Sequence, residues 1–213
     1  TLADTTRFQQ WKPREQYLAR FNYRRIGERW DFGYKAEGMH DVITNRGMPR
    51  APYFETAFDE RYTTLRLDNA LTVERRFAPG TKANVILAHN RYVRRSNLWF
   101  RDLTDLREQL VEGADEQDTS GFTLSNLRAT FVQAKDSAQV TFEAGVDLNQ
   151  ETGKGNRIGD GEEGIGDYAL FASAEYLPLP AITLRPGLRY AYNTRYGAPL
   201  VPSFNLRWQM NEG

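Results

Sequence analysis

The sequence predicts an all-β fold: an antiparallel transmembrane β-barrel segment that shows about nine strands and is part of a larger barrel. First, apolar and polar residues alternate with a period of two along nine stretches, as in strands with one apolar face. Second, short turns and long polar segments alternate strictly as connections. An outer-membrane barrel separates its connections in this way, with short periplasmic turns and long extracellular loops.

Each alternating stretch predicts one strand, because its apolar residues fall on one side and its polar residues on the other. In chain order the stretches are Tyr17–Arg24, Arg29–Gly38, Leu65–Glu74, Ala83–Asn90, Asn126–Phe131, Gln139–Asn149, Asp167–Tyr176, Ala181–Asn193 and Pro202–Gln209. The stretch Ala181–Asn193, "AITLRPGLRYAYN", has Pro186 in its middle. Proline cannot donate to the ladder, so we expect a local bulge there.

Two sets of connections join these stretches. The short turns are Arg25–Arg29, Arg76–Lys82, Ala134–Ala138 and Leu177–Ala181. The long polar segments are His40–Arg61, Arg95–Gly121 and Gln150–Gly166. Within the second of these, Arg101–Gly113 places leucines at helical spacing, which predicts a short helix in an extracellular loop. Its apolar stripe packs on neighbouring loops or contacts a ligand or a partner lipoprotein.

The polar faces of the stretches mix Arg, Lys, Asp and Glu, which is typical of a water-filled lumen. The apolar faces carry Leu, Val and Ala centrally, with Tyr and Trp toward the ends, which is typical of a lipid-facing band edged by aromatics. We therefore predict that the apolar face points outward to lipid. The alternative is a soluble lipocalin-like barrel, which would enclose the apolar face instead.

Bulk composition narrows the function classes. Lys plus Arg and Asp plus Glu number 28 each, so the net charge gives no indication of nucleic acid. There is no cysteine and no apolar run of about 18 residues for a membrane-spanning helix. The two histidines, His40 and His89, have no partner at metal-ligand spacing, and no catalytic motif is present, so we expect no enzyme. The first residues show no signal peptide pattern, which indicates a processed chain or a piece of a longer one.

Particular stretches are similar to a known family. The segment "GDYALFASAEYLPLPAITLRPGLRYAYNTRYGAPLVPSFNLRWQ" (Gly166–Gln209) resembles the barrel of a TonB-dependent outer-membrane receptor. The segment "RAPYFETAFDERYTTLRLDNAL" (Arg50–Leu71) is similar to one of that family's extracellular loops descending into a strand. The resemblance covers most of the chain but only part of the family's architecture.

The resemblance implies a location in the bacterial outer membrane and uptake of a scarce nutrient: a ferric siderophore, a corrinoid, an oligosaccharide or a peptide. It also implies contact with outer-membrane lipid, and energy from the TonB complex through a plug domain. No plug or TonB box is visible, and the end "RWQMNEG" lacks the usual terminal aromatic residue. We therefore expect residues 1–213 to form one partial barrel domain without a plug. The alternatives are a small passive pore or structural barrel, or a soluble β-barrel carrier.

Two groups of residues are candidates for ligand binding. Arg66, Arg185 and Arg189 lie on the predicted lumen face, where arginine suits carboxylate or phosphate groups, although a charge ladder of the wall is the simpler explanation because mixed charge is usual inside barrels. Arg50, Tyr53 and Phe54 combine arginine with rigid aromatics in the first long segment, as binding hot spots do, or they pack that loop. The acidic, glycine-rich loop Asp160–Asp167 suggests Ca²⁺, but calcium-loop spacing is absent, which favours no cofactor.

Overall fold

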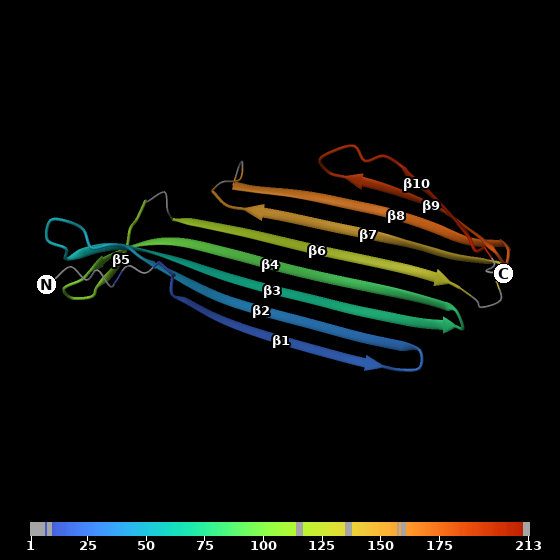
Figure 1. Cartoon of the computed structure of the whole chain (residues 1–213), viewed down its shortest axis with the longest axis horizontal. Coiled ribbons are helices and arrows are strands. Elements are labelled where there is room, and N and C mark those ends of the chain that lie inside the picture. The colour runs from blue at the N-terminus through green and yellow to red at the C-terminus, as the bar shows by residue number, and fades with distance from the viewer. Residues whose placement is uncertain are drawn as a thin grey trace.

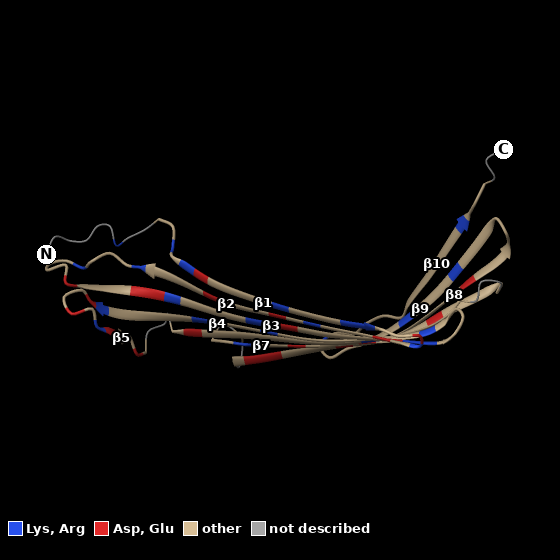
Figure 2. Cartoon of the chain, turned by 90° about the horizontal axis from the view of Figure 1, so that it is seen from below, with Lys and Arg blue, Asp and Glu red and all other residues tan. Residues whose placement is uncertain are grey.

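The computed structural model describes residues 7, 10–113, 117–134, 138–156, 158 and 161–210, and these form one curved antiparallel sheet (Figures 1 and 2). Strand order follows chain order, with β5 beside β4 as a side branch. The strands are β1 Arg14–Ile26, β2 Trp30–Arg46, β3 Thr56–Ala78, β4 Thr81–Asp102, β5 Glu108–Leu110, β6 Asp118–Gln133, β7 Val140–Lys154, β8 Glu162–Leu179, β9 Ile182–Asn193 and β10 Val201–Trp208. The prediction of an all-β antiparallel fold is confirmed.

The nine long strands match the nine predicted stretches to within one residue where a stretch reaches past its strand, but several strands extend much further toward one end. β3 has 23 residues and β4 has 22, and their pairing continues from Ala78–Thr81 to Thr56–Asp102. Much of what the sequence assigned to long loops is therefore paired strand. Backbone groups form an antiparallel ladder whatever the side chains are, so polar residues such as Asn45 and Glu60 continue it.

The connections fall into two groups, one at each end of the sheet (Figure 1). We call the end with residues 47–55, the β4–β6 and β7–β8 connections and residues 194–200 the loop end. The other end, with the connections β1–β2, β3–β4, β6–β7 and β8–β9, is the turn end. No segment in the described part of the chain forms a helix of the length and hydropathy required to cross a membrane.

The predicted helix at Arg101–Gly113 is wrong, because this segment forms a second hairpin. β4 runs to Asp102, and β5 returns beside it, pairing Glu108 with Arg101. Asp102 Oδ1 accepts hydrogen bonds from the backbone N–H (2.8 Å) and hydroxyl (2.6 Å) of Thr104, which fixes a turn. Aspartate offers the backbone this local partner in place of helical bonds, and Leu106 has a φ of 63°, which an α-helix excludes.

The bulge predicted at Pro186 is also not found. The pairs Ser173–Gly187 and Tyr176–Leu184 lie on either side of it in one unchanged register. The register shifts later, between Tyr176 and Leu179, next to the β8–β9 turn. Loss of one backbone donor therefore leaves the alignment of these strands intact, and the irregularity lies where the chain reverses.

The pairing register places the apolar residues of successive strands side by side. One row crosses seven strands and consists of Tyr34, Leu71, Leu87, Leu127, Leu148, Tyr168 and Tyr192. We call the side of the sheet that carries this row the apolar face. The opposite side is the polar face, with Thr72, Arg128 and Asp147. A slip of one residue in the pairing of two strands would move every side chain of one strand to the opposite face of the sheet. The register therefore keeps the apolar face continuous.

The apolar face is uncovered. Its large side chains stand exposed, including Leu170 (59%), Tyr190 (57%) and Phe204 (66%). Within the described ranges, the only buried hydrophobic residues are Ala57 and Ala169. In that same part of the chain β1 pairs only with β2 and β10 only with β9, so the curved sheet is not closed (Figure 2).

Ion pairs within and between strands stabilise the polar face. Arg189 on β9 donates to Asp147 on β7 at 3.1 Å, and Arg128 on β6 approaches the same carboxylate at 3.9 Å. Asp147 is almost buried (9% exposed). Glu37 on β2 similarly contacts Arg20 at 2.9 Å and Lys35 at 2.7 Å. The carboxylates of these pairs are thus less exposed to solvent than the basic side chains that contact them.

Gly145 tests the packing of the polar face. A Cβ at this position would lie 2.6 Å from Cζ of Phe171 and would also collide with the backbone oxygen of Ala129. We expect Gly145→Val to lower the free energy of unfolding by about 1–3 kcal/mol, as overpacking does. The measurement is the denaturant midpoint of the folded protein. Gly33→Ala is the control, because its new Cβ would meet Thr72 at an ordinary 3.8 Å. Equal midpoints for the two variants would contradict this packing.

Candidate functional site

Toward the loop end, the polar face carries a group of apolar side chains. They are Tyr92 on β4, Phe122 and Leu124 on β6, and Ile165 on β8. Tyr92 and Phe122 are direct partners across β4 and β6, and their ring centroids lie 6.2 Å apart at an interplanar angle of 44°. The apolar residues nearer the turn end of these strands, such as Leu127 and Tyr168, lie on the opposite face.

These side chains line a hollow of about 860 Å³, within the range of about 300–1,000 Å³ found for ligand pockets. Its rim is polar and includes Arg66, Asp68 and Glu151. A mostly apolar wall with a few polar groups at its edge is the usual composition of a small-molecule site. We therefore take this hollow as the candidate binding site.

The β7–β8 connection covers one side of the hollow. Ile158 lies so close to Gly153 that a Cβ on this glycine would be 3.0 Å from Ile158 Cδ1 and 3.4 Å from Phe122 Cε1. Ile158 N donates to Gly155 O at 3.1 Å, and Gly161 N donates to Ile158 O at 3.0 Å. The missing side chain at Gly153 thus allows an isoleucine from the connection to reach the aromatic wall.

Two arginines among the residues that line the hollow are paired with carboxylates. Arg66 Nε lies 2.6 Å from Asp68 Oδ2. Arg195, from the β9–β10 connection, pairs with Glu163 and donates to the backbone oxygen of Gly164 at 2.9 Å. Arg91 and Glu151 also border the hollow, and neither has an ion-pair partner among the described residues. The lining therefore offers charges of both signs and hydrogen-bonding groups around an apolar body.

Of the three arginines predicted on the lumen face, only Arg66 belongs to the hollow. Arg189 is bound to Asp147 at 3.1 Å, and Arg185 pairs with Glu175 at 3.1 Å. Both lie on β9, five strands away from β3 in the sheet order. The structure therefore does not bring the three together into one anion-binding wall, and each has a carboxylate partner of its own.

The predicted loop residues Arg50, Tyr53 and Phe54 lie in the β2–β3 connection, at the far end of the sheet (Figure 1). The Arg50 guanidinium packs over the Phe58 ring at 4.8 Å, and Arg50 N donates to Thr56 O at 2.8 Å. Phe54 closes the tight turn with a φ of 59°. Tyr53 is 77% exposed. Arg50 and Phe54 thus take part in the loop's own structure although both are exposed, and Tyr53 is more exposed than Phe54.

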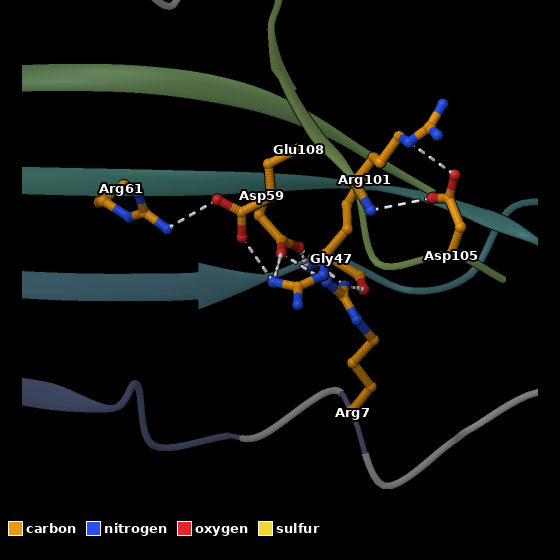
Figure 3. Close-up of polar contacts among 8 residues, drawn as sticks. Arg7, Gly47, Asp59, Arg61, Arg101, Asp105 and Glu108 are labelled. Atoms are coloured by element: carbon orange, nitrogen blue, oxygen red, sulfur yellow. Dashed lines mark hydrogen bonds and ion pairs between the residues drawn. The ribbon is translucent and has the colours of Figure 1, made fainter. Parts of the chain in front are cut away.

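A buried ion pair joins the chain before β1 to the loop end of the β2–β3 hairpin (Figure 3). Both terminal nitrogens of the Arg7 guanidinium, Nη1 and Nη2, contact the carboxylate of Asp59. Both side chains are almost buried, at 8% and 7% exposure. Arg7 also donates to Gly47 O at 2.7 Å, while Gly47 N donates to Asp59 Oδ1 at 3.1 Å. The fork of arginine satisfies both carboxylate oxygens, which is the geometry that makes a buried pair favourable.

The same network extends to β5. Arg101 Nη1 lies 3.9 Å from Asp59 and 2.6 Å from Glu108, and Arg61 Nη2 reaches the other oxygen of Glu108 at 3.3 Å (Figure 3). Three strands and the segment before β1 are therefore tied together by alternating charges. This network holds the loop-end parts of β3, β4 and β5 in a fixed arrangement.

On the polar face of the β2–β3 hairpin, Glu60 accepts hydrogen bonds from Asn45 (2.9 Å) and from the Tyr62 hydroxyl (2.8 Å). The Asn45 bond, followed by the Tyr62 bond, lowers the pKa of Glu60 although partial burial opposes this. The hydrogen bond to Glu60 in turn raises the pKa of Tyr62. Both groups therefore keep their ordinary charge states near neutral pH, and neither is poised for proton transfer.

The acidic loop suggested for Ca²⁺ shows no shared site among its described residues. Glu162 pairs with Lys154 at 2.8 Å and Glu163 with Arg195, and adjacent strand residues point to opposite faces. Asp160 lies outside the described residues. Across the described ranges there is no group of three His, Asp or Glu side chains that could hold a metal ion.

No family model matches this sequence, and a search of curated proteins finds no match either.

Several residues of the hollow were missed from the sequence, although the sequence contains a signal for them. On β6 the apolar spacing is two from Phe122 to Leu124 but three from Leu124 to Leu127. On β8 it is again three, from Ile165 to Tyr168. A spacing of three changes the face that apolar side chains occupy. The same change on two strands predicts an apolar patch on the polar face.

The Arg7–Asp59 pair gives a test of the outer network. Asp59→Asn leaves the Arg7 guanidinium without its charge partner, and breaking a buried pair costs about 3–5 kcal/mol. We expect hydrogen exchange of the Gly47 amide, which donates to Asp59, to accelerate at least tenfold, as seen by NMR or mass spectrometry. Asp105→Asn is the control, because its partner Arg107 is 87% exposed and such pairs contribute little. Unchanged protection of Gly47 in the Asp59 variant would contradict the role of this pair.

Proposed function

We propose that this chain is part of the wall of an outer-membrane β-barrel, and that the barrel is a TonB-dependent receptor that imports a scarce nutrient. The observation that supports the barrel most directly is the exposed apolar face, continuous across the sheet from Tyr34 to Tyr192. A contiguous apolar surface of this extent needs a partner, and lipid is the partner that suits a whole sheet face.

The dimensions of the apolar face fit a bilayer. Its apolar runs are Val140–Leu148 on β7, Tyr168–Tyr176 on β8 and Ile182–Tyr192 on β9. Each has the length of about 9–11 residues that a tilted strand needs to cross the hydrocarbon core. Toward the loop end, Tyr168 and Tyr192 end the runs of β8 and β9, and Tyr176 and Trp208 lie toward the turn end. Aromatic residues at both limits are what the two interfaces of a membrane favour.

The strands continue beyond this band. β3, with 23 residues, spans about 75 Å at about 3.3 Å per residue. The hydrocarbon core of a bilayer is only about 30 Å thick. The loop end would therefore extend well beyond the membrane, and the hollow and the Arg7–Asp59 network belong to this projecting part. The short connections at the turn end suit the periplasmic side.

The strand directions support a larger barrel. β1 and β10 both run from the loop end to the turn end, so joining them directly would make a parallel pair. An antiparallel closure requires an odd number of additional strands between them. Two copies in one membrane, with their loop ends on the same side, meet the same obstacle at each edge. The free edges of β1 and β10 therefore fit a wall segment of a larger closed sheet.

Nutrient import is the part of the proposal that rests on the resemblance to TonB-dependent receptors. The hollow supplies a place for a ligand on the face that a barrel turns inward. Its apolar wall, with basic and acidic residues both among the lining, suits the less charged of the nutrient classes, a corrinoid, an oligosaccharide or a peptide, better than a strongly anionic one. Energy would come from the TonB complex through a plug, and a surface lipoprotein would dock at the loop end.

Arginine substitutions on the two faces test the membrane assignment. Val146 lies on the apolar face between Ala129 and Leu170, whereas Thr72 lies on the polar face between Gly33 and Ile86. We expect Val146→Arg to destabilise the inserted protein by about 2–4 kcal/mol, as for a cation at the lipid midplane, and Thr72→Arg to be far milder. The measurement is urea-dependent folding into lipid vesicles. Equal effects would show that the faces are assigned wrongly.

A second test concerns the hollow. Phe122→Ala removes half of its aromatic pair, and loss of such an anchor commonly costs a factor of about 10–30 in affinity. We expect a corresponding rise in the nutrient concentration for half-maximal uptake. Uptake is measured in a strain that depends on this protein, with each nutrient class supplied in turn. Thr130→Ala, on the same strand and face but outside the hollow, is the control. Identical uptake by both variants would exclude the hollow as the binding site.

A further inference from the structure

The apolar face changes character directly beyond its lipid-facing band, toward the loop end. After the row with Leu87, Leu127 and Leu148, this face carries hydrogen-bond donors on three adjacent strands. They are Arg91 and Arg95 on β4, Thr119 and Thr123 on β6, and Thr152 and Lys154 on β7. We call these six residues the donor patch. Within these rows of the three strands, no aspartate or glutamate shares the face.

The register sets the geometry of the donor patch. Arg91 lies beside Thr123 and Thr152, Arg95 lies beside Thr119, and Gly121 lies beside Lys154. Neighbouring strands are about 4.8 Å apart and residues four apart along a strand about 13 Å, so the three cationic side chains surround Gly121. A Cβ at Gly121 would have only Tyr92 O within 4 Å, at 3.9 Å. The centre of the donor patch is therefore an open floor between three positive charges.

Of the three cationic side chains in the donor patch, only Lys154 has an ion-pair partner among the described residues. Lys154 pairs with the exposed Glu162 at 2.8 Å, at the border of the donor patch. Arg91 and Arg95 are exposed, and neither has an ion-pair partner among the described residues. On the polar face, Arg66 and Arg189 each have a carboxylate within about 3 Å. Two positive charges without such partners, close together on an outward surface, attract an external anion.

We propose that the donor patch binds the anionic, phosphate-bearing headgroup of a membrane lipid. Guanidinium, ammonium and hydroxyl donors are the groups that recognise phosphate oxygens, and basic residues beside a membrane bind anionic headgroups. The position specifies a lipid rather than a free anion, because Leu87 and Leu127 on the same face continue directly into the band that acyl chains would cover. This inference rests on the proposed orientation of the apolar face toward lipid.

The test uses the whole protein in a neutral detergent, titrated with the bis-phosphorylated glycolipid lipid A, with bound lipid counted by native mass spectrometry. We expect the triple variant Arg91→Gln, Arg95→Gln, Lys154→Gln to bind lipid A at least tenfold more weakly. The control replaces Arg20, Arg24 and Arg207 with Gln, which gives the same change in charge on the polar face. Equal weakening in both triple variants would overturn the site.

Gly121→Val provides a test that leaves the charge unchanged. The open floor accepts the new side chain without a backbone collision, so the variant folds, but the added methyl groups occupy the space for a phosphate. We expect weaker lipid A binding here as well, and unchanged binding would count against the site.

Two further probes separate the inference from the proposed function. Inorganic phosphate that competes at the same concentration as lipid A would show an anion site without lipid recognition, and would overturn the lipid assignment. Equal binding of phosphatidylcholine and lipid A to a protein that inserts into bilayers would overturn this inference alone. A protein that neither needs detergent nor inserts would overturn the proposed function as well.

Discussion

The structure depends on one constraint, the unbroken antiparallel register from β1 to β10. The two register shifts among the described residues lie beside short turns, between Arg76 and Ala78 and between Tyr176 and Leu179. Between the turns each residue keeps the same two neighbours, so every side chain stays on its face. Because the backbone bonds hold the sheet whatever the side chains are, the sequence is free to place different chemistry on the two faces and at different heights.

That freedom explains how one sheet holds both an apolar band and an apolar hollow on opposite sides. The backbone does not change between Leu124 and Leu127 on β6, yet the first side chain belongs to the hollow and the second to the band. Only the spacing of apolar residues changes, from two to three, and this reverses the side on which they emerge. The hollow therefore requires no extra element, since the apolar residues of β6 and β8 change face at the same height in the sheet. Its remaining cover comes from Ile158 in the β7–β8 connection.

Local patterns in the sequence were sufficient for the strands and the order of connections, because alternation is a property of each strand alone. Strand length was underestimated, since the ends of β2 and β3 carry polar residues such as Asn45 and Glu60, and the backbone ladder continues through them without apolar alternation. The helix at Arg101–Gly113 was inferred from leucine spacing, whereas the Asp102 turn decides the local conformation. The Arg7–Asp59 pair was beyond sequence reasoning, because it joins residues 52 positions apart and no periodic pattern marks either.

Charge placement shows most clearly why composition alone was uninformative about function. Basic and acidic residues are equal in number, at 28 each, but they are not equally distributed over the surface. On the polar face Asp147 and Asp68 lie under arginines, because a sheltered charge without a partner is costly. Beyond the apolar band, Arg91 and Arg95 stand exposed without such partners in the described part of the chain. An external anion would supply the counter-charge for these two arginines. Register and face, rather than net charge, therefore indicate where an anionic partner belongs.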